Sequence, residues 1–392
     1  MIPVAEAQAR VLALARVLPV EAVPLAGAAG RVMLAPAVTA RSQPPFAAAA
    51  MDGYAMAAGA ARPGARLKVV GESRAGHGYA GVLGAGEAVR IFTGAPLPEG
   101  AGHVVIQEDA ERDGEHVLLR EVGAAHVRPA GVDFAAGHRL EAPRRLRPAD
   151  LALLAAMNVA EVVAARRPEV ALIATGDELV MPGEVPGPDQ IVASNIFALK
   201  AMAEAEGARV RLLPIARDDA LSLATVLGLA EGADVVVTVG GASVGDHDLV
   251  GEVAAGLGLE RAFWKVAMRP GKPLMAGRLG EAVLLGLPGN PVSAIVCGHL
   301  FLLPLLRALQ GVVEPLPRRL AGVAGVDLEA NGPREHYMRA RLEPGDGVPG
   351  LVPLGDQDSS LLSVLAEAEA LLIRPAGAPA VPAGTPVRWL AI

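Results

Sequence analysis

The first run of residues suited to chemistry is Thr175–Leu179, which contains two carboxylates and directly follows a predicted buried strand, Glu169–Ala174. Ligands of a doubly wound sheet bind beyond the carboxyl ends of its strands. Gly176 permits a sharp turn at that point, so that Glu178 can project into the crevice. The alternative is an ordinary turn that carries two solvated acids.

A second run, Gly240–Asp248, follows the predicted strand Asp234–Val239. Its glycines let backbone N–H groups converge on an anionic oxygen, and its aspartates suit Mg²⁺ bound to phosphate oxygens. The run is not a Walker A loop, because no Gly-Lys-Ser/Thr follows. A purely structural turn is the alternative, and His247 is expected to orient neighbours or face solvent rather than bind a ligand. The residues predicted to contact a ligand are Gly240, Gly241, Ser243, Gly245 and Asp248.

A third group of residues is basic. Lys265 precedes the run Arg269–Pro273, in which prolines stiffen the loop. The two cations of this run, Arg269 and Lys272, stand three residues apart. That spacing on a stiff loop suits a small oxyanion or a phosphate. A solvated basic turn is the alternative.

The fourth run, Gly286–Ala294, joins a predicted strand to a predicted helix. Pro291 suits the first helical position, and Ser293 and the free first-turn N–H groups then face the loop. A tight strand-to-helix joint is the alternative.

All four runs fall at the same end of the predicted sheet. Together they describe a crevice for a phosphorylated ligand with a divalent cation.

The composition excludes several classes of protein. Of the 392 residues, 52% are hydrophobic and 20% are charged, which excludes generic disorder. The net charge of -7 and the aromatic content of 3% argue against a general polyanion binder and against stacking platforms for single-stranded nucleic acid. The single cysteine, Cys297, excludes an internal disulfide and a Cys-rich metal site, which fits a reducing cytoplasm. The charged N-terminal residues leave no unbroken apolar core, so no signal peptide is expected.

The pattern of apolar residues changes along the chain. It predicts an amphipathic helix over 1–20, an all-β segment from Phe46 to about Val132, and a helical segment from Pro143 to Ala165. Strands and helices alternate from Pro168 to about Leu309, which predicts a mostly parallel sheet. A β pattern returns from Pro317.

One uncharged stretch, Ala282–Leu306, has to be weighed as a membrane span. Pro288–Pro291 interrupts it, and the part that follows is about 15 residues, or roughly 22 Å as a helix, short of the ~30 Å hydrocarbon core. The sequence therefore predicts a strand, a turn and a buried helix over Pro291–Leu309, with no membrane association.

Taken together, these runs resemble the MoeA family of molybdopterin molybdenumtransferases, which also includes the E domains of plant and animal molybdenum-insertion proteins. The matching runs occur in the family's order and cover most of the chain. They are Met51–Ala55, Phe92–Pro98, Thr175–Leu179, Ser194-Asn195, Gly240–Asp248, Arg269–Pro273 and Gly286–Ala294.

The resemblance implies a multidomain α/β plus β fold with an elongated protomer. It also implies a homodimer, with each active site between the α/β domain of one protomer and β parts of the other. The four expected parts are a Mog-like doubly wound α/β domain (1–20 and 166–316), a small α/β linking and dimer domain (21–45 and 134–165), a β-rich domain (46–133) and a C-terminal β-barrel domain (317–392).

The implied reaction is the last step of molybdenum cofactor synthesis. Adenylylated molybdopterin and molybdate would give molybdenum cofactor and AMP, with Mg²⁺ or a similar cation. The family's functional acids fall on Asp52, Asp133, Glu178, Asp218 and Asp248. Other positions important in the family match Thr93, Pro288 and Pro291.

The resemblance also implies a role for each charged group. Carboxylates would hold the cation, which would shield the phosphoanhydride and stabilise AMP as a leaving group. The carboxylates expected to hold it are Glu178, Asp218 and Asp248. The residues expected to hold molybdate are Arg269, Lys272 and Ser293, with Arg334, Arg339 and Ser359 as weaker candidates for guiding it. No protein nucleophile is required, and Cys297 is expected to be inert.

Two other functions stay open. The family's Mog-like branch adenylylates molybdopterin, but much of this chain lies outside the α/β core. A non-catalytic scaffold that binds a peptide or clusters a receptor is the second, and the retained acids argue against it. The expected partners are a second copy of the chain, the molybdopterin nucleotide, the molybdopterin adenylyltransferase and cofactor-accepting enzymes, with no nucleic acid and no membrane. We expect a cytoplasmic protein.

Overall fold

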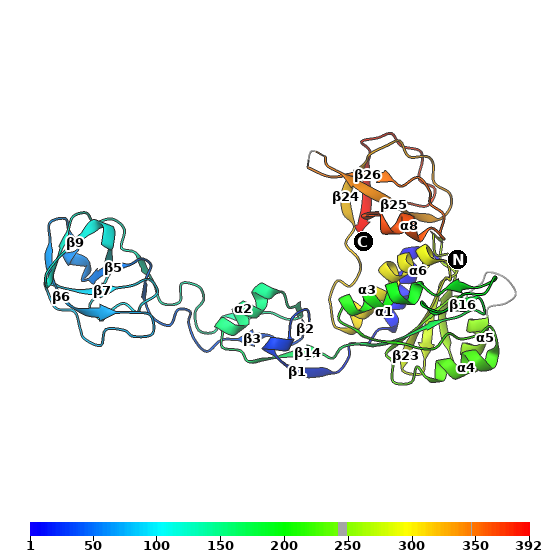
Figure 1. Ribbon diagram of the computed structural model, residues 1–392, viewed down its shortest axis with the longest axis horizontal. Coiled ribbons are helices and arrows are strands. Elements are labelled where there is room, and N and C mark those ends of the chain that lie inside the picture. The colour runs from blue at the N-terminus through cyan, green and yellow to red at the C-terminus, as the bar shows by residue number, and fades with distance from the viewer. Residues whose placement is uncertain (242–248, 346) are drawn as a thin grey trace.

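The protein is elongated. Figure 1 shows its computed structural model, which describes residues 1–241, 249–345 and 347–392. A β-rich body lies at one end, a small body of sheet and helix lies in the middle, and the α/β body lies at the other end with the C-terminal β-barrel beside it (Figure 1). This arrangement agrees with the predicted multidomain α/β plus β fold.

A six-stranded sheet forms the centre of the α/β body, in the order β18-β15-β19-β23-β22-β20. The first four strands run parallel, and β22 is antiparallel to both of its neighbours. The mostly parallel sheet is therefore confirmed. The strands are β18 (Arg209–Leu212), β15 (Glu169–Ala174), β19 (Val235–Val239), β23 (Ala282–Leu287), β22 (Met275–Leu279) and β20 (Glu260–Trp264).

Helices cover both faces of this sheet (Figure 1). One face packs against α1 (Val4–Leu14), α3 (Asn195–Ala205), α6 (Pro291–Cys297) and α7 (Leu303–Leu309), and the other against α4 (Ala220–Gly228) and α5 (Leu249–Gly256). Strand β15 contributes side chains to the cores on both faces of the sheet, because alternate side chains of a strand point to opposite faces. Val170 and Leu172 join the first core, whereas Ala171 and Ile173 join the second.

The apolar stretch after Pro291 is a core helix. This helix consists of α6, a π-helical turn over Gly298–Leu302, and α7. By length and composition Pro291–Leu309 could cross a membrane, with a mean hydropathy of 1.9, but 78% of its most apolar window is buried inside the protein. The predicted buried helix is confirmed. The π turn lies just before Pro304, which lacks the N–H that a regular helix would use there.

The small body corrects two of the predicted helices. Its sheet has the order β1-β14-β2-β13, in which β2 is Val32–Met33 and β13 is Arg144–Arg145. Strand β1 (Val20–Pro24) pairs antiparallel with β14 (Glu161–Ala165). The helix predicted over Pro143–Ala165 is therefore wrong beyond α2 (Pro148–Ala156), because pairing with β1 outweighs the local helical spacing. Similarly, the helix predicted over 1–20 ends at Leu14, since the chain must extend to enter β1.

A largely buried carboxylate, that of Glu206, joins the small body to the α/β body. Glu206 follows α3, and the exposed fraction of its side chain is 13%. Its Oε2 atom accepts a hydrogen bond of 2.9 Å from Arg145 in β13 (Arg144–Arg145), and its Oε1 atom accepts one of 2.8 Å from Arg307 in α7. Two cations from two bodies thus share one acid, which fixes the position of the small sheet against the helices.

The β-rich body contains the predicted all-β segment. Its sheet has the order β8-β5-β7-β6-β10-β9, and its core combines alanine and β-branched residues with Tyr54, Met56, Leu67 and Leu119. The strands are β8 (His103–Ile106), β5 (Gly53–Met56), β7 (Glu87–Ile91), β6 (Arg66–Ser73), β10 (His116–Leu119) and β9 (Ala110–Asp113).

The C-terminal part forms the predicted barrel. It is closed by pairing between the long strand β25 and β27, and β21 (Met268–Arg269) of the α/β body adds to β25 in parallel. The barrel strands are β24 (Leu320–Ala324), β25 (Glu335–Glu343), β26 (Gly350–Pro353), β27 (Ala370–Arg374) and β28 (Pro386–Ala391). The residue limits of the four domains stay a prediction.

The core that carries the parallel sheet should be sensitive to loss of volume. Phe301 is 0% exposed, whereas Phe197 on α3 is 40% exposed. We expect Phe301→Ala to lower the free energy of unfolding by about 3–5 kcal/mol, because it leaves a cavity. The matched variant Phe197→Ala should cost about 1 kcal/mol or less. Denaturant unfolding of both variants measures this, and equal losses would contradict the packing described.

Candidate functional site

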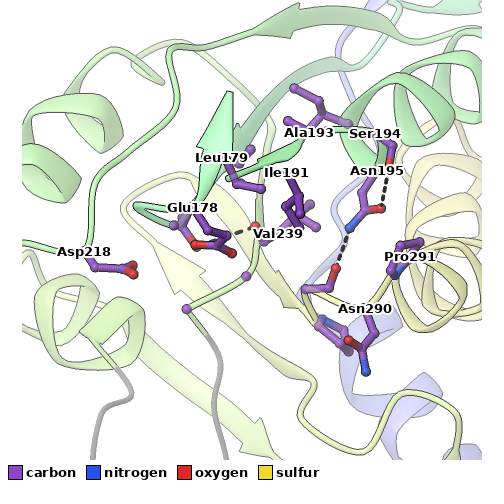
Figure 2. A pocket seen from close by; sticks show the side chains of 18 of the residues that line it. Glu178, Leu179, Ile191, Ala193, Ser194, Asn195, Asp218, Val239, Asn290 and Pro291 are labelled. Atoms are coloured by element: carbon purple, nitrogen blue, oxygen red, sulfur yellow. Dashed lines mark hydrogen bonds between the residues drawn. The ribbon is translucent and has the colours of Figure 1, made fainter. Parts of the chain in front are cut away.

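A pocket of about 1000 Å³ lies at the carboxyl ends of β15, β19 and β23 and is drawn in Figure 2. Of the predicted site residues, those that line it are Glu178, Asp218, Gly240, Gly241, Pro288 and Pro291. Lining residues that the sequence analysis did not select as site residues include Ile191, Asn195, Glu252, Asn290 and Ser360. The predicted crevice at the strand ends is therefore present.

Glycine lets the turns after β15 and β19 lie against each other. Gly240 has a φ of 103°, and a Cβ there would lie 2.5 Å from the backbone oxygen of Thr175. Gly241 has a φ of 65°, and a Cβ there would lie 2.6 Å from Val250. Both the conformation and the close contact exclude a side chain. This explains why these two positions are glycine.

Two predicted acids lie on the same side of the pocket, Glu178 after β15 and Asp218 before α4 (Figure 2). Their loops are bonded together: Asp177 Oδ1 accepts from the Asp218 N–H at 3.3 Å, and the Asp177 carbonyl accepts from Arg217 at 3.1 Å. These bonds fix where Asp218 stands. Carboxylate oxygens are the ligands that Mg²⁺ prefers, so the pair fits the chemistry of a hard divalent cation.

The third predicted metal ligand, Asp248, lies outside the described residues, as do Ser243 and Gly245. Within the ranges that are described, no three His, Cys, Asp or Glu side chains gather closely enough to hold a metal ion. A further exposed acid, Glu252 on α5, does line the pocket. No motif marks Glu252, and only its position one helical turn after Leu249 places it at this wall.

Asparagine side chains tie the walls of the pocket together. Asn195 at the start of α3 donates to the carbonyl of Gly289 at 2.6 Å (Figure 2). Asn290 donates to the hydroxyl of Ser359 at 2.9 Å, and the carbonyl of Ser359 accepts from the Val292 N–H at 3.1 Å. The barrel segment that contains Ser359 therefore forms one wall. Ser359 itself does not line the pocket, although Ser360 does.

Other predicted molybdate residues lie behind this wall or beside it. Ser293 is 4% exposed in α6, and Arg339 is 1% exposed. The Arg339 guanidinium donates to the carbonyl of Leu361 at 3.2 Å and to the side chain of Gln357 at 3.4 Å. Arg339 thus holds the loop that carries Ser359. Arg334 is partly buried, and it lines neither this pocket nor the smaller one described next.

The basic loop runs between two pockets. Its last residue, Pro273, lines the large pocket, and its first, Arg269, lines a second pocket of about 430 Å³ in the barrel. Lys272 is partly buried between them. Lys265 has a φ of 68°, and its Nζ atom lies 3.7 Å from the ring centroid of Trp264. The ammonium of Lys265 is therefore already engaged by an aromatic face.

A histidine beside Arg269 is held neutral. His336 is 7% exposed at the second pocket, and its Nε2 atom has no hydrogen-bond partner among the described residues. Burial lowers the pKa of His336 to about 4, and repulsion from Arg269, Arg334 and Arg339 acts in the same direction. His336 therefore adds no positive charge beside Arg269 at neutral pH.

The predicted residues Asp52 and Thr93 form a pair in the β-rich body. Asp52 Oδ1 accepts hydrogen bonds from the backbone N–H and from the hydroxyl of Thr93, each at 2.8 Å. These two bonds hold the pKa of Asp52 below its usual value, and attraction by Arg90 adds to the effect. Asp52 is thus a preoriented, ionised carboxylate at neutral pH.

Within one protomer this pair lies far from the pocket. Asp52 and Thr93 flank β5 and β7, at the opposite end of the molecule from β23 and α5 (Figure 1). Asp133 is exposed on the chain that returns from the β-rich body, where its N–H donates to the Gln43 carbonyl at 3.0 Å. The structure therefore brings the predicted residues together in separate groups.

Three family descriptions match successive parts of the chain: "MoeA N-terminal region (domain I and II)" over 2–158, "Probable molybdopterin binding domain" over 171–308, and "MoeA C-terminal region (domain IV)" over 321–392. A molybdopterin molybdenumtransferase of Nostoc sp. is 35% identical over 94% of this chain and 87% of its own length. Molybdopterin molybdenumtransferase 2 of Mycobacterium tuberculosis is 35% identical over 93% of both proteins. A MoeA protein structure from Pyrococcus horikoshii has a TM-score of 0.82 at 25% identity and covers 100% of both chains.

Because of the close contact at Gly240, a side chain at this position should weaken ligand binding in the pocket. We expect Gly240→Ala to weaken the binding of AMP with Mg²⁺ about tenfold or more, because the added methyl must push the turn after β19 away from Thr175. Isothermal titration calorimetry measures this. The control is Gly228→Ala in α4, where a Cβ meets nothing within 4 Å. Wild-type affinity in Gly240→Ala would contradict the pocket assignment.

Proposed function

This chain belongs to the MoeA family of molybdopterin molybdenumtransferases, which are transferases of molybdenum cofactor biosynthesis, and we propose that it inserts molybdate into adenylylated molybdopterin, with release of AMP, at a site shared by two protomers. The observation that carries this proposal is the pocket of about 1000 Å³ in which Glu178 and Asp218 stand at the ends of parallel strands. Its volume suits a nucleotide-sized ligand.

Glu178 and Asp218 are the proposed ligands of a divalent cation, with Asp248 as the third carboxylate from the predicted set. When bound, Mg²⁺ or a similar cation would shield the phosphoanhydride and favour departure of AMP. The glycine turn at Gly240 and Gly241 lets backbone come close to the phosphate. Asn195 and Asn290 hold the opposite wall in place, so that the ligand meets a fixed surface.

Molybdate, a tetrahedral dianion, is the proposed second substrate of the basic loop. The side chains of Arg269 and Lys272 make no hydrogen bond or ion pair within the described ranges, which leaves both available to an oxyanion. Arg339 and Ser359 would support this site from the barrel, since they hold the loop that closes the large pocket. Binding molybdate next to the nucleotide pocket would supply proximity to the dithiolene.

The separation of Asp52 from the pocket supports a homodimer. One protomer holds the pair of Asp52 and Thr93 at one end and Glu178 at the other (Figure 1). In a symmetric dimer the β-rich body of one copy can reach the pocket of the second copy, so that each site is completed across the interface. Asp133, on the chain that returns from the β-rich body, would belong to this contribution.

The rival functions are not favoured. The family matches extend from residue 2 to residue 392, well beyond the α/β body that an adenylyltransferase would need. A non-catalytic scaffold would have no need for acids held at a nucleotide-sized pocket. A cytoplasmic location is part of the proposal and rests on the single, buried cysteine. The molybdopterin adenylyltransferase and cofactor-accepting enzymes are the proposed neighbours in the pathway.

The reaction itself is tested by AMP release from adenylylated molybdopterin. We expect release to require both molybdate and a divalent cation, and to fall after chelation with EDTA. Glu178→Gln should lower kcat about 100-fold, because a charged ligand near the leaving group is lost. The exposed Glu231→Gln serves as the matched control. Release that is independent of molybdate would contradict the assignment.

The shared site is tested by mixing inactive variants. Asp52→Asn and Glu178→Gln alter different ends of the protomer. In an equal mixture that exchanges subunits, half of the dimers combine both variants, and each of these retains one intact site. We therefore expect recovery of about a quarter of wild-type activity. No recovery, although two differently tagged variants co-purify as mixed dimers, would show that the site lies within one protomer.

A further inference from the structure

Arg90 lies between two aromatic rings beside the pair of Asp52 and Thr93. Its guanidinium carbon is 5.1 Å from the ring centroid of Tyr54 and 4.8 Å from that of Phe92. Tyr54 is directly opposite Arg90 across β5 and β7. Two aromatic faces at these distances both attract the cation and restrict its movement.

The same guanidinium bonds to Gly53 at the start of β5 and to Gln107 in the 3-10 turn that follows β8. Its Nη1 atom donates to the carbonyl of Gly53 at 3.0 Å, and its Nη2 atom donates to Oε1 of Gln107 at 2.6 Å. Gln107 in turn donates its backbone N–H to the carbonyl of Asp52 at 3.0 Å. Asp52 is thus held from both sides, through Gly53 and through Gln107.

The backbone at Gly53, next to Asp52, is tightly packed against β8. Gly53 lies so close to β8 that a Cβ would come within 1.9 Å of the Val105 carbonyl oxygen. The turn that carries Asp52 is therefore pressed against β8 on one side and held by Arg90 on the other. Phe92, which stacks on Arg90, is followed directly by Thr93, so the guanidinium contacts the neighbours of both members of the pair.

We infer that Arg90 is a positioning residue for the reaction: it holds the turn at Asp52 and the strand end at Thr93 so that the Asp52 carboxylate is presented, oriented, to the substrate. This inference rests on the proposed function. Arg90 acts through Asp52 and does not touch the substrate. The planar fork of arginine bonds to two acceptors and stacks on rings at once, which the ammonium of lysine cannot do.

The experiment compares Arg90→Ala, Arg90→Lys and the control Arg66→Ala, an exposed arginine of the same body whose partner is Asp113. We expect Arg90→Ala to lower kcat about tenfold or more while KM for adenylylated molybdopterin changes less than twofold, because misplacement of a reacting group costs rate. Arg90→Lys should recover part of kcat, and Arg66→Ala should match the wild type.

The pH profile separates this role from a purely structural one. Because Arg90 attracts the Asp52 carboxylate, the acid limb of kcat should move to higher pH in Arg90→Ala and stay in place in Arg66→Ala. A wild-type kcat, a loss confined to KM, or an unshifted acid limb in Arg90→Ala would each overturn the inference.

A crystal structure of Arg90→Ala gives an answer that does not depend on activity. We expect Asp52 Oδ1 to lose at least one of its two bonds to Thr93. If the wild type releases no AMP with molybdate, the proposed function fails, and this structure alone decides the role of Arg90. An unchanged Asp52 and Thr93 pair in the variant would overturn the inference.

Discussion

The absence of a side chain at Gly240 is the constraint on which the pocket depends. It allows the turn after β19 to touch the backbone of Thr175, so that three parallel strands end side by side. The acids at Glu178 and Asp218 then face one space, because Asp177 bonds their loops together. A larger residue at Gly240 would separate the elements that the site needs.

The second constraint is the separation, within one protomer, between Asp52 and the pocket at the other end of the molecule. Buried contacts at Glu206 hold the small body against the α/β body, and the β-rich body extends beyond it (Figure 1). The Asp52 carboxylate is held in a fixed orientation, as expected of a functional group. It accepts two hydrogen bonds from Thr93, and Arg90 bonds to the neighbouring Gly53 carbonyl. A symmetric pair of protomers reconciles a well-formed Asp52 with a pocket at the other end of the chain.

Local patterns in the sequence were sufficient for much of the fold and for the position of the pocket. The strand Glu169–Ala174 has the predicted limits, because its apolar run is buried on both faces. The error over Glu161–Ala165 arose because a partner strand distant in sequence decides that segment. Glu252 and Arg90 were missed for a related reason: their roles come from three-dimensional neighbours and not from a motif. Glu178 was expected at the strand ends because it follows a buried strand, whereas Asp218 was assigned from the family resemblance.

The central claim is that one charged pocket is completed by two copies of the chain. A crystal structure of the wild-type protein with AMP, Mg²⁺ and molybdate tests it most directly. The account predicts AMP phosphate beside Glu178 and Asp218, with the carboxylate of Asp52 from the second copy facing the same space. AMP bound elsewhere, or Asp52 of both copies turned to solvent away from the nucleotide, would contradict it.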